Sequence, residues 1–355
     1  MTTRQRLDNA LGLLKGLGCD GLLLNSRANV SYMAGFDAPD ALLIITHRDA
    51  VLMTDFRYSA DFKRRAPSFL KIVEYKNGLF ENAAKRLLSE KAGLIGFESR
   101  HLVFEACEVL HRCCGKAVTL VPLKETVEPL RELKSPEELR LIRKALQINL
   151  KALRFAETKL KPGITEREVA ADLECFIRRA GARSSAFDII VASGPNASYP
   201  HASVTDRKLK NGEPVIIDMG VDYEGYKCDL TRTFFLGRIP PIVRRVAALV
   251  AEAQKISIKR IKPGVPLKVV DAAARSFISQ KGYGRQFGHA LGHGVGLEVH
   301  EGPAVNKKND CPAKPGMVFT VEPGIYLTGR FGVRMEEMVL VTAKGVEVLS
   351  GHAQH

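Results

Sequence analysis

One segment of this chain occurs twice, and the duplication limits the folds that are open to its second half. Lys161-Pro162-Gly163, a helical segment and Gly181 recur as Lys262-Pro263-Gly264, a helical segment and Gly282, and the glycines of each matching pair lie 101 positions apart. A long repeat that occurs once is typical of two pseudo-symmetric halves packed together, because solenoids are built from many short repeats. Chance recurrence of a Lys-Pro-Gly helix stop is the alternative interpretation.

A predicted pair of strands that carries two acids follows each copy. Runs of β-branched and aromatic residues predict these strands in VIIDMGVDYEGYKCDLTRTFF, joined near 223–225, and in MVFTVEPGIY and GVRMEEMVLVT, which flank 327–331. The acids are nearly symmetric about their turns: Asp218 and Asp229 in the first pair, Glu322 and Glu336 in the second. Buried carboxylates are unfavourable unless a cation neutralises them, and cross-strand neighbours approach within about 5 Å. We therefore predict a shared cation, with solvated hairpin acids as the alternative.

A glycine-rich histidine segment, HALGHGVGLEVHE, lies between the two pairs of acids. Its glycines keep the backbone slim around His293, so that the imidazole can reach a crowded centre. The spacing does not indicate a phosphate loop, because the Walker lysine and the strand, turn and helix context are missing. A lone histidine is more often a satisfied core residue than a ligand, but four of the nine histidines fall near the acidic strands: His201, His289, His293 and His300.

The first part of the chain is predicted to form a separate, small α/β domain. Helices are expected at 4–17, 80–91 and 102–113, and strands at 21–24, as a pair across 41–54, at 93–97 and at 117–121. Ser135-Pro136-Glu137-Glu138 then has the N-cap, the early proline and the capping-box glutamate of a new helix, which is expected to run to Leu160. We therefore predict an N-terminal domain at 1–124, a linker at 125–134 and a catalytic domain at 135–355.

Bulk composition excludes several classes of protein. Apolar residues at 45% exclude a largely disordered chain, and no apolar run is long enough to cross a bilayer, so no membrane partner is expected. The 53 basic and 39 acidic residues give a net charge of +14, but basic and acidic residues mix along helices without interleaved aromatics, which argues against a nucleic-acid partner. Seven cysteines without paired metal spacing and an N-terminus without a cleavable apolar core predict a cytoplasmic protein with reduced thiols.

The segment from Ser135 to Leu349 resembles the pita-bread metallopeptidases, the family of methionine aminopeptidase, aminopeptidase P and prolidase. The motifs that carry the resemblance are VIIDMG, CDLTRTF, GHGVGLEVHE, FTVEPGIY and GVRMEEMVLVT. Upstream, NVSYMAGF and TDFRY resemble the N-terminal domain of the aminopeptidase P, prolidase and creatinase branch, which methionine aminopeptidases lack. The resemblance implies an α/β N-terminal domain of the creatinase/prolidase type and an α+β pita-bread catalytic domain with a pseudo-two-fold internal duplication.

The resemblance also implies a site with two metal ions. Asp229 and Glu336 would bridge the ions, Asp218 would complete one site, and His293 and Glu322 would complete the other. A hydroxide held between the ions would attack the bond between an N-terminal residue and a following proline. Four carboxylates and one imidazole favour Mn²⁺ or Co²⁺, with Zn²⁺ or Fe²⁺ as alternatives.

Further side chains are implied around the substrate. Glu322 is a candidate proton shuttle, and His201 or His300 could bind the developing oxyanion or the carbonyl after proline. Arg334 could orient Glu336 or bind a substrate carboxylate, and His289 would line the same pocket. Three positions depart from the pattern: Glu337 replaces the usual Asp, Tyr199 replaces an aliphatic residue, and Cys228 replaces a small polar one. Tyr199 stands just before the Pro-His pair, so it is expected to bind substrate and to reshape the proline pocket.

The sequence leaves several hypotheses about the activity open. We favour an Xaa-Pro dipeptidase over an Xaa-Pro aminopeptidase, because the chain is compact and its N-terminal domain is short. A creatinase-like hydrolase that acts without metal is an alternative, as is a pseudoenzyme that acts as a binding protein, although both would be expected to lack metal ligands. Relatives with this arrangement are commonly homodimers whose N-terminal domain borders the partner's active site, so we expect a homodimer that acts on short proline-containing peptides.

Overall fold

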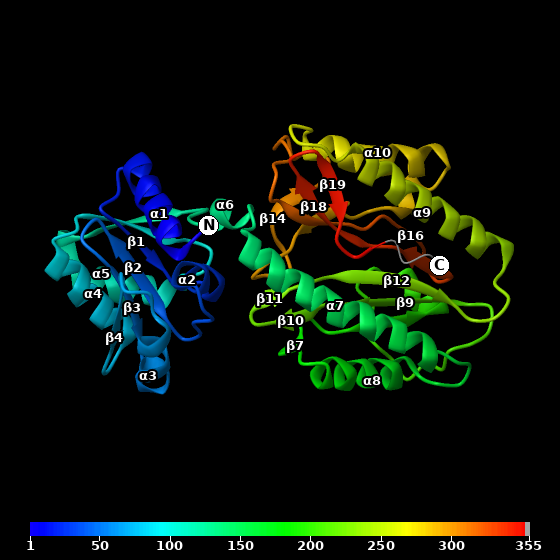
Figure 1. The fold of residues 1–355 in the computed structure, drawn as a ribbon, viewed down its shortest axis with the longest axis horizontal. Helices are drawn as coiled ribbons and strands as arrows, with labels where there is room; N and C mark the ends of the chain where they lie inside the picture. Colours follow the sequence, from blue (N-terminus) through cyan, green and yellow to red (C-terminus); the bar gives the residue numbers. More distant parts are fainter. Residues whose placement is uncertain (352–355) are drawn as a thin grey trace. The chain divides into compact units, whose positions relative to one another are not determined.

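The computed structural model describes residues 1–351, which divide into two compact units (Figure 1). The first unit is Met1–Arg131 and the second begins at Glu132. The division falls inside the segment predicted as a linker, part of which forms the short helix α6 (Glu128–Arg131). Among residues 1–351, none of the helices combines the length and the apolar character that a membrane span requires.

The first unit is built on one mixed sheet of six strands in the order β4-β3-β2-β1-β5-β6. The strands are β1 (Gly21–Leu24), β2 (Leu42–Thr46), β3 (Ala50–Thr54), β4 (Leu70–Glu74), β5 (Leu94–Glu98) and β6 (Thr119–Leu123). The helices are α1 (Thr3–Leu17), α2 (Arg27–Ala34), α3 (Phe56–Arg65), α4 (Leu79–Glu90), α5 (Phe104–Cys114) and α6. Apolar side chains of α4 and α5 pack with those of the sheet in one buried cluster.

Every helix and strand predicted for this unit is present, and besides the short helix α6 in the expected linker, α2, α3 and β4 were missed. Helix α2 has only eight residues, too short for a clear helical period, although Ser26 caps it and Gly35 ends it. Helix α3 buries only Ser59 and Phe62, so its sequence has too few apolar positions to reveal a helical period. The third missed element is β4, a sheet edge with one buried residue.

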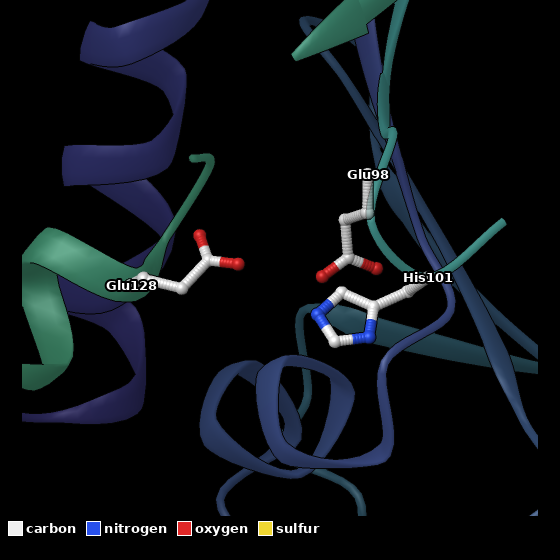
Figure 2. Close-up of side chains that lie close together, drawn as sticks. All are labelled: Glu98, His101 and Glu128. Carbon is white, nitrogen blue, oxygen red and sulfur yellow. The ribbon is translucent and has the colours of Figure 1, made fainter. Parts of the chain in front are cut away.

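A polar cluster in the first unit ties α2 to β5 and α6. Figure 2 shows the Glu98 carboxylate beside the His101 ring, with Glu128 facing them from α6. The Asn29 amide donates to both carboxylates, and backbone N–H groups of Asn25 and Ser26 donate to Glu98. Hydrogen bonds therefore account for the arrangement of these acids without a cation.

We expect Glu98→Ala to lower the free energy of unfolding by about 3 kcal/mol, because it leaves several buried donors without an acceptor. Urea titration followed by circular dichroism measures the change. The matched control is Glu105→Ala, because Glu105 is an exposed glutamate in the first turn of α5, and a shift below about 0.5 kcal/mol is expected for it. Equal shifts for the two variants would contradict a structural role for the Glu98 cluster.

The second unit contains the duplication that the sequence predicts. Helices α7 (Pro136–Lys159) and α8 (Glu166–Arg179) belong to the first copy, and α9 (Pro241–Arg260) and α10 (Leu267–Gln280) to the second. Matching backbone bonds are made between the two helices of each pair: Gly163 N–H donates to Leu209 O, and Gly264 N–H donates to Ala313 O. Both glycines have positive φ, 95° and 85°, a conformation that other residues rarely adopt.

The predicted acidic strands are each broken into two shorter ones. The first copy contains β9 (Pro214–Met219), β10 (Val221–Tyr223), β11 (Tyr226–Lys227) and β12 (Leu230–Phe235). The second contains β15 (Val318–Val321), β16 (Gly324–Leu327), β17 (Phe331–Arg334) and β18 (Glu337–Thr342). Three of the four acids, Asp229, Glu322 and Glu336, lie in the breaks, where the strand alternation no longer dictates the side-chain direction.

The remaining strands complete the sheets of the second unit. They are β7 (Ser184–Ser185), β8 (Ile190–Ser193), β13 (Gly292–Gly294), β14 (Glu301–Val305) and β19 (Gly345–Val348). The sheet orders are β11-β10-β7, β12-β9-β8, β14-β13-β15-β18-β19 and β16-β17. Side chains of α7 and α8 share a buried cluster with β9, and those of α9 and α10 share another with β15 and β17, so each half has its own core.

Candidate metal centre

Three of the five expected ligands lie together, two of them at strand breaks and His293 in β13. Ligand atoms of Asp229, His293 and Glu336 all lie within 4.8 Å of one another. His293 Nε2 is 3.7 Å from Asp229 Oδ2 and 3.3 Å from Glu322 Oε1, which brings in the fourth. Asp218, the fifth, lines the same cavity, whose volume is about 920 Å³.

Strand register places Asp218 and Asp229 slightly farther apart than two residues that stand directly opposite each other. Asp218 in β9 pairs with Thr231 in β12, so Asp229 is its diagonal neighbour and does not stand directly opposite. Diagonal neighbours remain close enough for long or convergent side chains to meet. The two acids can therefore serve one centre without lying on the same rung of the ladder.

The glycines beside His293 allow three backbones to approach closely. A Cβ at Gly292 would lie 1.9 Å from Thr320 O, and one at Gly294 would lie 2.1 Å from Gly302 O. His293 Nδ1 is 3.2 Å from the carbonyl oxygen of Gly294, which can only accept, so Nδ1 carries the proton. Nε2 then faces the carboxylates, where it donates to Glu322 in the protonated ring and offers its lone pair to a metal ion once that proton is lost.

Buried carboxylate oxygens without partners converge on this centre. Among residues 1–351, Asp218 Oδ1, Asp229 Oδ1 and Glu336 Oε1 are buried and accept no hydrogen bond. Burial, followed by repulsion from Glu336 and Asp218, raises the pKa of Asp229 well above its usual value. Burial and the charges of Glu322 and Asp218 do the same to the pKa of Glu336. Like charges held together in a buried place fit a divalent cation, and this oxygen-rich donor set suits hard metal ions.

Arg334 and Thr231 orient two of the acids. Arg334 Nη2 lies 2.6 Å from Asp218 Oδ2, Nε donates to Thr231 Oγ1 at 3.0 Å, and Nη1 donates to Tyr326 OH at 2.8 Å. Thr231 Oγ1 in turn donates to Glu336 Oε2 at 2.8 Å. The remaining oxygen of each acid is therefore the one that is left without a partner.

Tyr326 and Thr231 were not predicted as site residues. Burial raises the pKa of Tyr326 to about 12, so its hydroxyl stays protonated near neutral pH. The position of Tyr326 in the motif FTVEPGIY, four residues after Glu322, was the available signal. Thr231 lies in the motif CDLTRTF, two residues after Asp229, but its role depends on how β12 pairs with its neighbours.

The expected pocket residues divide into those that line the cavity and one that does not. His201, His289, His300 and Arg334 line it. The His300 ring centroid is 4.1 Å from that of His293, and burial together with the His293 charge lowers the pKa of His300. His289 Nε2 is 3.2 Å from Tyr326 OH, and burial lowers the pKa of His289. Tyr199 is 55% exposed and is not among the cavity-lining residues.

The other two unusual positions pack behind the ligands. Glu337 forms a buried ion pair with Arg232, 3.0 Å between Oε1 and Nη2, and Arg232 also donates to the carbonyl oxygen of Glu336. Cys228 is buried, and its sulfur accepts a hydrogen bond from the Asn149 amide. Glu337 and Cys228 are the chain neighbours of Glu336 and Asp229, so their contacts help to hold the backbone that carries these two acids.

Comparisons with known proteins agree with this geometry. The model of metallopeptidase family M24 matches residues 140–343, and that of the creatinase/prolidase N-terminal domain matches residues 6–133. The uncharacterized peptidase YqhT of Bacillus subtilis (strain 168) is 39% identical over 340 residues, 96% of each chain. A Bacillus anthracis Xaa-Pro dipeptidase structure matches with a TM-score of 0.96 and 34% identity, covering 100% of this chain and 99% of that one. An X-Pro aminopeptidase structure from Thermotoga maritima MSB8 matches with a TM-score of 0.88 and 36% identity, covering 96% and 98%.

Proposed function

The chain belongs to metallopeptidase family M24, and from this premise we propose that it uses two divalent metal ions to hydrolyse the bond between an N-terminal residue and proline. The observation that carries the proposal is the set of three buried, unpartnered carboxylate oxygens of Asp218, Asp229 and Glu336 in the cavity that His293 also lines. Together with Glu322, these side chains would hold the ions, with Asp229 and Glu336 as bridging ligands and Mn²⁺ or Co²⁺ as the preferred metal.

Bound metal ions would lower the pKa of water to give a nucleophile and would polarise the scissile carbonyl. Glu322 is the candidate proton shuttle. Burial raises the pKa of Glu322, but the hydrogen bond and the charge of His293 outweigh burial, so this pKa is lowered and the carboxylate stays ionised. An ionised carboxylate can take a proton from the attacking water and return it to the leaving amine. His201 and His300, which line the cavity, would donate hydrogen bonds to the oxyanion or to the carbonyl after proline.

Arg334 is better suited to orienting ligands than to binding substrate. All three of its nitrogens have partners, namely Asp218, Thr231, Tyr326 and the carbonyl oxygen of Pro200. A substrate carboxylate would have to displace one of these bonds. We therefore assign to Arg334 the role of fixing the ligand Asp218 and, through Thr231, Glu336.

We propose a dipeptide as the preferred substrate, a choice that the likeness to the B. anthracis Xaa-Pro dipeptidase over the full length of both chains supports. With Mn²⁺ added, Ala-Pro is expected to be hydrolysed at least about tenfold faster than Ala-Pro-Ala, measured as kcat/KM, and Ala-Ala should be a poor substrate. Chromatographic detection of released alanine measures all three rates. Faster hydrolysis of the tripeptide would overturn the dipeptide preference. It would favour an aminopeptidase instead, in line with the similarity of this chain to the T. maritima X-Pro aminopeptidase.

A creatinase-like reaction without metal and a non-catalytic binding role are the competing proposals. Both are disfavoured by the five retained ligand residues. Metal analysis of protein purified without added metal, followed by the peptide assay, separates them from the proposed function.

We also propose a cytoplasmic homodimer with reduced thiols, and the unpaired state of all seven cysteines supports the reduced thiols. Sedimentation at equilibrium tests the dimer.

A further inference from the structure

A single buried carboxylate holds the loop that carries His201. Glu166 is the first residue of α8 and is 0% exposed. Its Oε1 accepts hydrogen bonds from Ser193 N at 2.7 Å and Ser193 Oγ at 2.8 Å. Its Oε2 accepts from Asn196 Nδ2 at 2.8 Å, Thr205 Oγ1 at 2.6 Å and Thr205 N at 3.1 Å. The two ends of segment 193–205 therefore share one anchor, with Ser193 and Asn196 near its start and Thr205 at its end.

The opposite side of this loop contacts the metal centre. Arg334 Nη1 donates to Pro200 O at 3.1 Å, and the same guanidinium pairs with Asp218. Gly329 N donates to Ser198 Oγ at 3.0 Å. The residue after Pro200 is His201, which lines the cavity. The loop is thus held between Glu166 on one side and the partner of a proposed metal ligand on the other.

The duplicated half shows that the fold does not itself require this carboxylate. The counterpart of Glu166, 101 positions later, is Leu267, the first residue of α10. Both residues make the same backbone bond, from Glu166 N–H to Arg207 O and from Leu267 N–H to Cys311 O. A residue needed for this helix start in general would be acidic in both copies, but the acid occurs only in the copy whose following loop carries His201.

We propose that Glu166 is a positioning residue that holds His201 at the substrate, a role that rests on the proposed function. A glutamine at this position keeps the shape, but its NH₂ group cannot accept hydrogen bonds. Either the Ser193 N–H or the N–H groups of Asn196 and Thr205 then lose their acceptor, and one end of the loop is released. Because small misplacements of a group beside the reacting atoms are costly, Glu166→Gln is expected to lower kcat/KM for Ala-Pro by roughly 10- to 100-fold.

The matched control lies two residues further along the same turn. The carboxylate of Glu168 accepts hydrogen bonds from Thr165 N and Oγ1, it is exposed, and none of its hydrogen bonds reaches the 193–205 loop. Glu168→Gln is expected to change kcat/KM less than about twofold. Mn²⁺ affinity, measured by calorimetry on metal-free protein, should be unchanged in both variants. A loss of Mn²⁺ affinity in Glu166→Gln that matches its loss of activity would overturn the proposal.

A double-mutant cycle with His201→Ala separates positioning from general damage. In the His201→Ala background, Glu166→Gln should lower kcat/KM by no more than about twofold, because the group that it positions is absent. Equal losses in both backgrounds would refute the proposal. Thr205→Val removes the hydroxyl bond to Glu166 and the bond that the same hydroxyl accepts from Arg207 N, and leaves the other four bonds to Glu166 in place. It should give the same pattern with a smaller, several-fold loss, which keeps the test open if Glu166→Gln fails to fold.

Hydrogen exchange measures the anchoring without reference to activity. Amides in 194–205 should exchange faster in Glu166→Gln than in wild-type protein or in Glu168→Gln, while those in 289–296 stay unchanged. Unchanged exchange in 194–205 would refute the positioning role even if the protein is an active peptidase. Wild-type protein that exchanges as expected but does not hydrolyse Ala-Pro with Mn²⁺ would instead refute the proposed function, and with it the substrate-positioning part of this proposal.

Discussion

Asp229→Ala is expected to abolish hydrolysis of Ala-Pro. Asp229 is the proposed bridging ligand that stands between His293 and Glu336, and one of its oxygens is buried without a partner. Removing a ligand shared by both ions should release the ions. The several kcal/mol by which the metal ions would stabilise the transition state are then lost. At about 1.4 kcal/mol per factor of ten, kcat should fall by about a thousandfold or more.

Metal content and hydrolysis are measured together for this prediction. Mass spectrometric metal analysis after dialysis against Mn²⁺ should find about two ions per wild-type chain and fewer than one in Asp229→Ala. Asp222→Asn is the control, because Asp222 lies in the same hairpin, pairs with Lys227 and is outside the cavity. It should keep both the metal and the activity. An Asp229→Ala protein that hydrolyses Ala-Pro at the native rate would remove the basis of the proposed mechanism.

The second large effect concerns metal-free protein, which is expected to lose stability as pH rises above the ordinary pKa values of its buried acids. The pKa values of Asp229 and Glu336 are raised, mainly by burial and by their acidic neighbours, above the ordinary values of 3.8 and 4.5. The folded state therefore binds more protons than the unfolded state. Linkage then requires the free energy of unfolding to fall as pH rises from these ordinary values toward the raised ones, by up to about 1.4 kcal/mol per unit for each group.

Two other groups at the centre bear on this pH dependence. Burial lowers the pKa of His293, but Glu322 outweighs burial, so this pKa is raised. The contribution of His293 to the free energy of unfolding is therefore fully present below pH 6.5 and is also lost as pH rises. The pKa of Glu322 is lowered, so its contribution is present above 4.5 and is lost as pH falls. Glu322 thus opposes the trend, while Asp229, Glu336 and His293 agree with it.

Mn²⁺ should reverse the trend, because metal binding requires deprotonated ligands and becomes stronger as pH rises. Tm is measured across pH 4–8 with a chelator and with excess Mn²⁺, and the two curves should diverge by many degrees near pH 8. The double variant Asp229→Asn, Glu336→Gln is the control: its chelated protein should be more stable than chelated wild type near pH 8, and Mn²⁺ should leave its Tm unchanged. Metal-free wild-type protein that gains stability steadily toward pH 8 would contradict the predicted burial of these acids.

Local sequence signals predicted much of this molecule. The pita-bread fold, the creatinase/prolidase N-terminal domain and the membership of a metallopeptidase family are confirmed. The Lys-Pro-Gly repeat predicted the duplication because each glycine adopts a positive φ at an equivalent helix end. Helix caps and strand patterns are properties of neighbouring residues, so they can be read without the fold. Where those signals were weak, as in α2, α3 and β4, the elements were missed.

What surrounds each acid was decided by the tertiary structure alone. The sequence identified Asp218, Asp229 and Glu336 as acids in apolar strands, but not which of their oxygens would lack a partner. That depends on Arg334 and Thr231, which reach the acids from other strands. The same holds for Glu166, whose donors lie 27 to 39 positions away in the chain. Chain-local patterns determine which elements form, whereas hydrogen-bond partners depend on register and side-chain direction, which are set only when distant elements pack together.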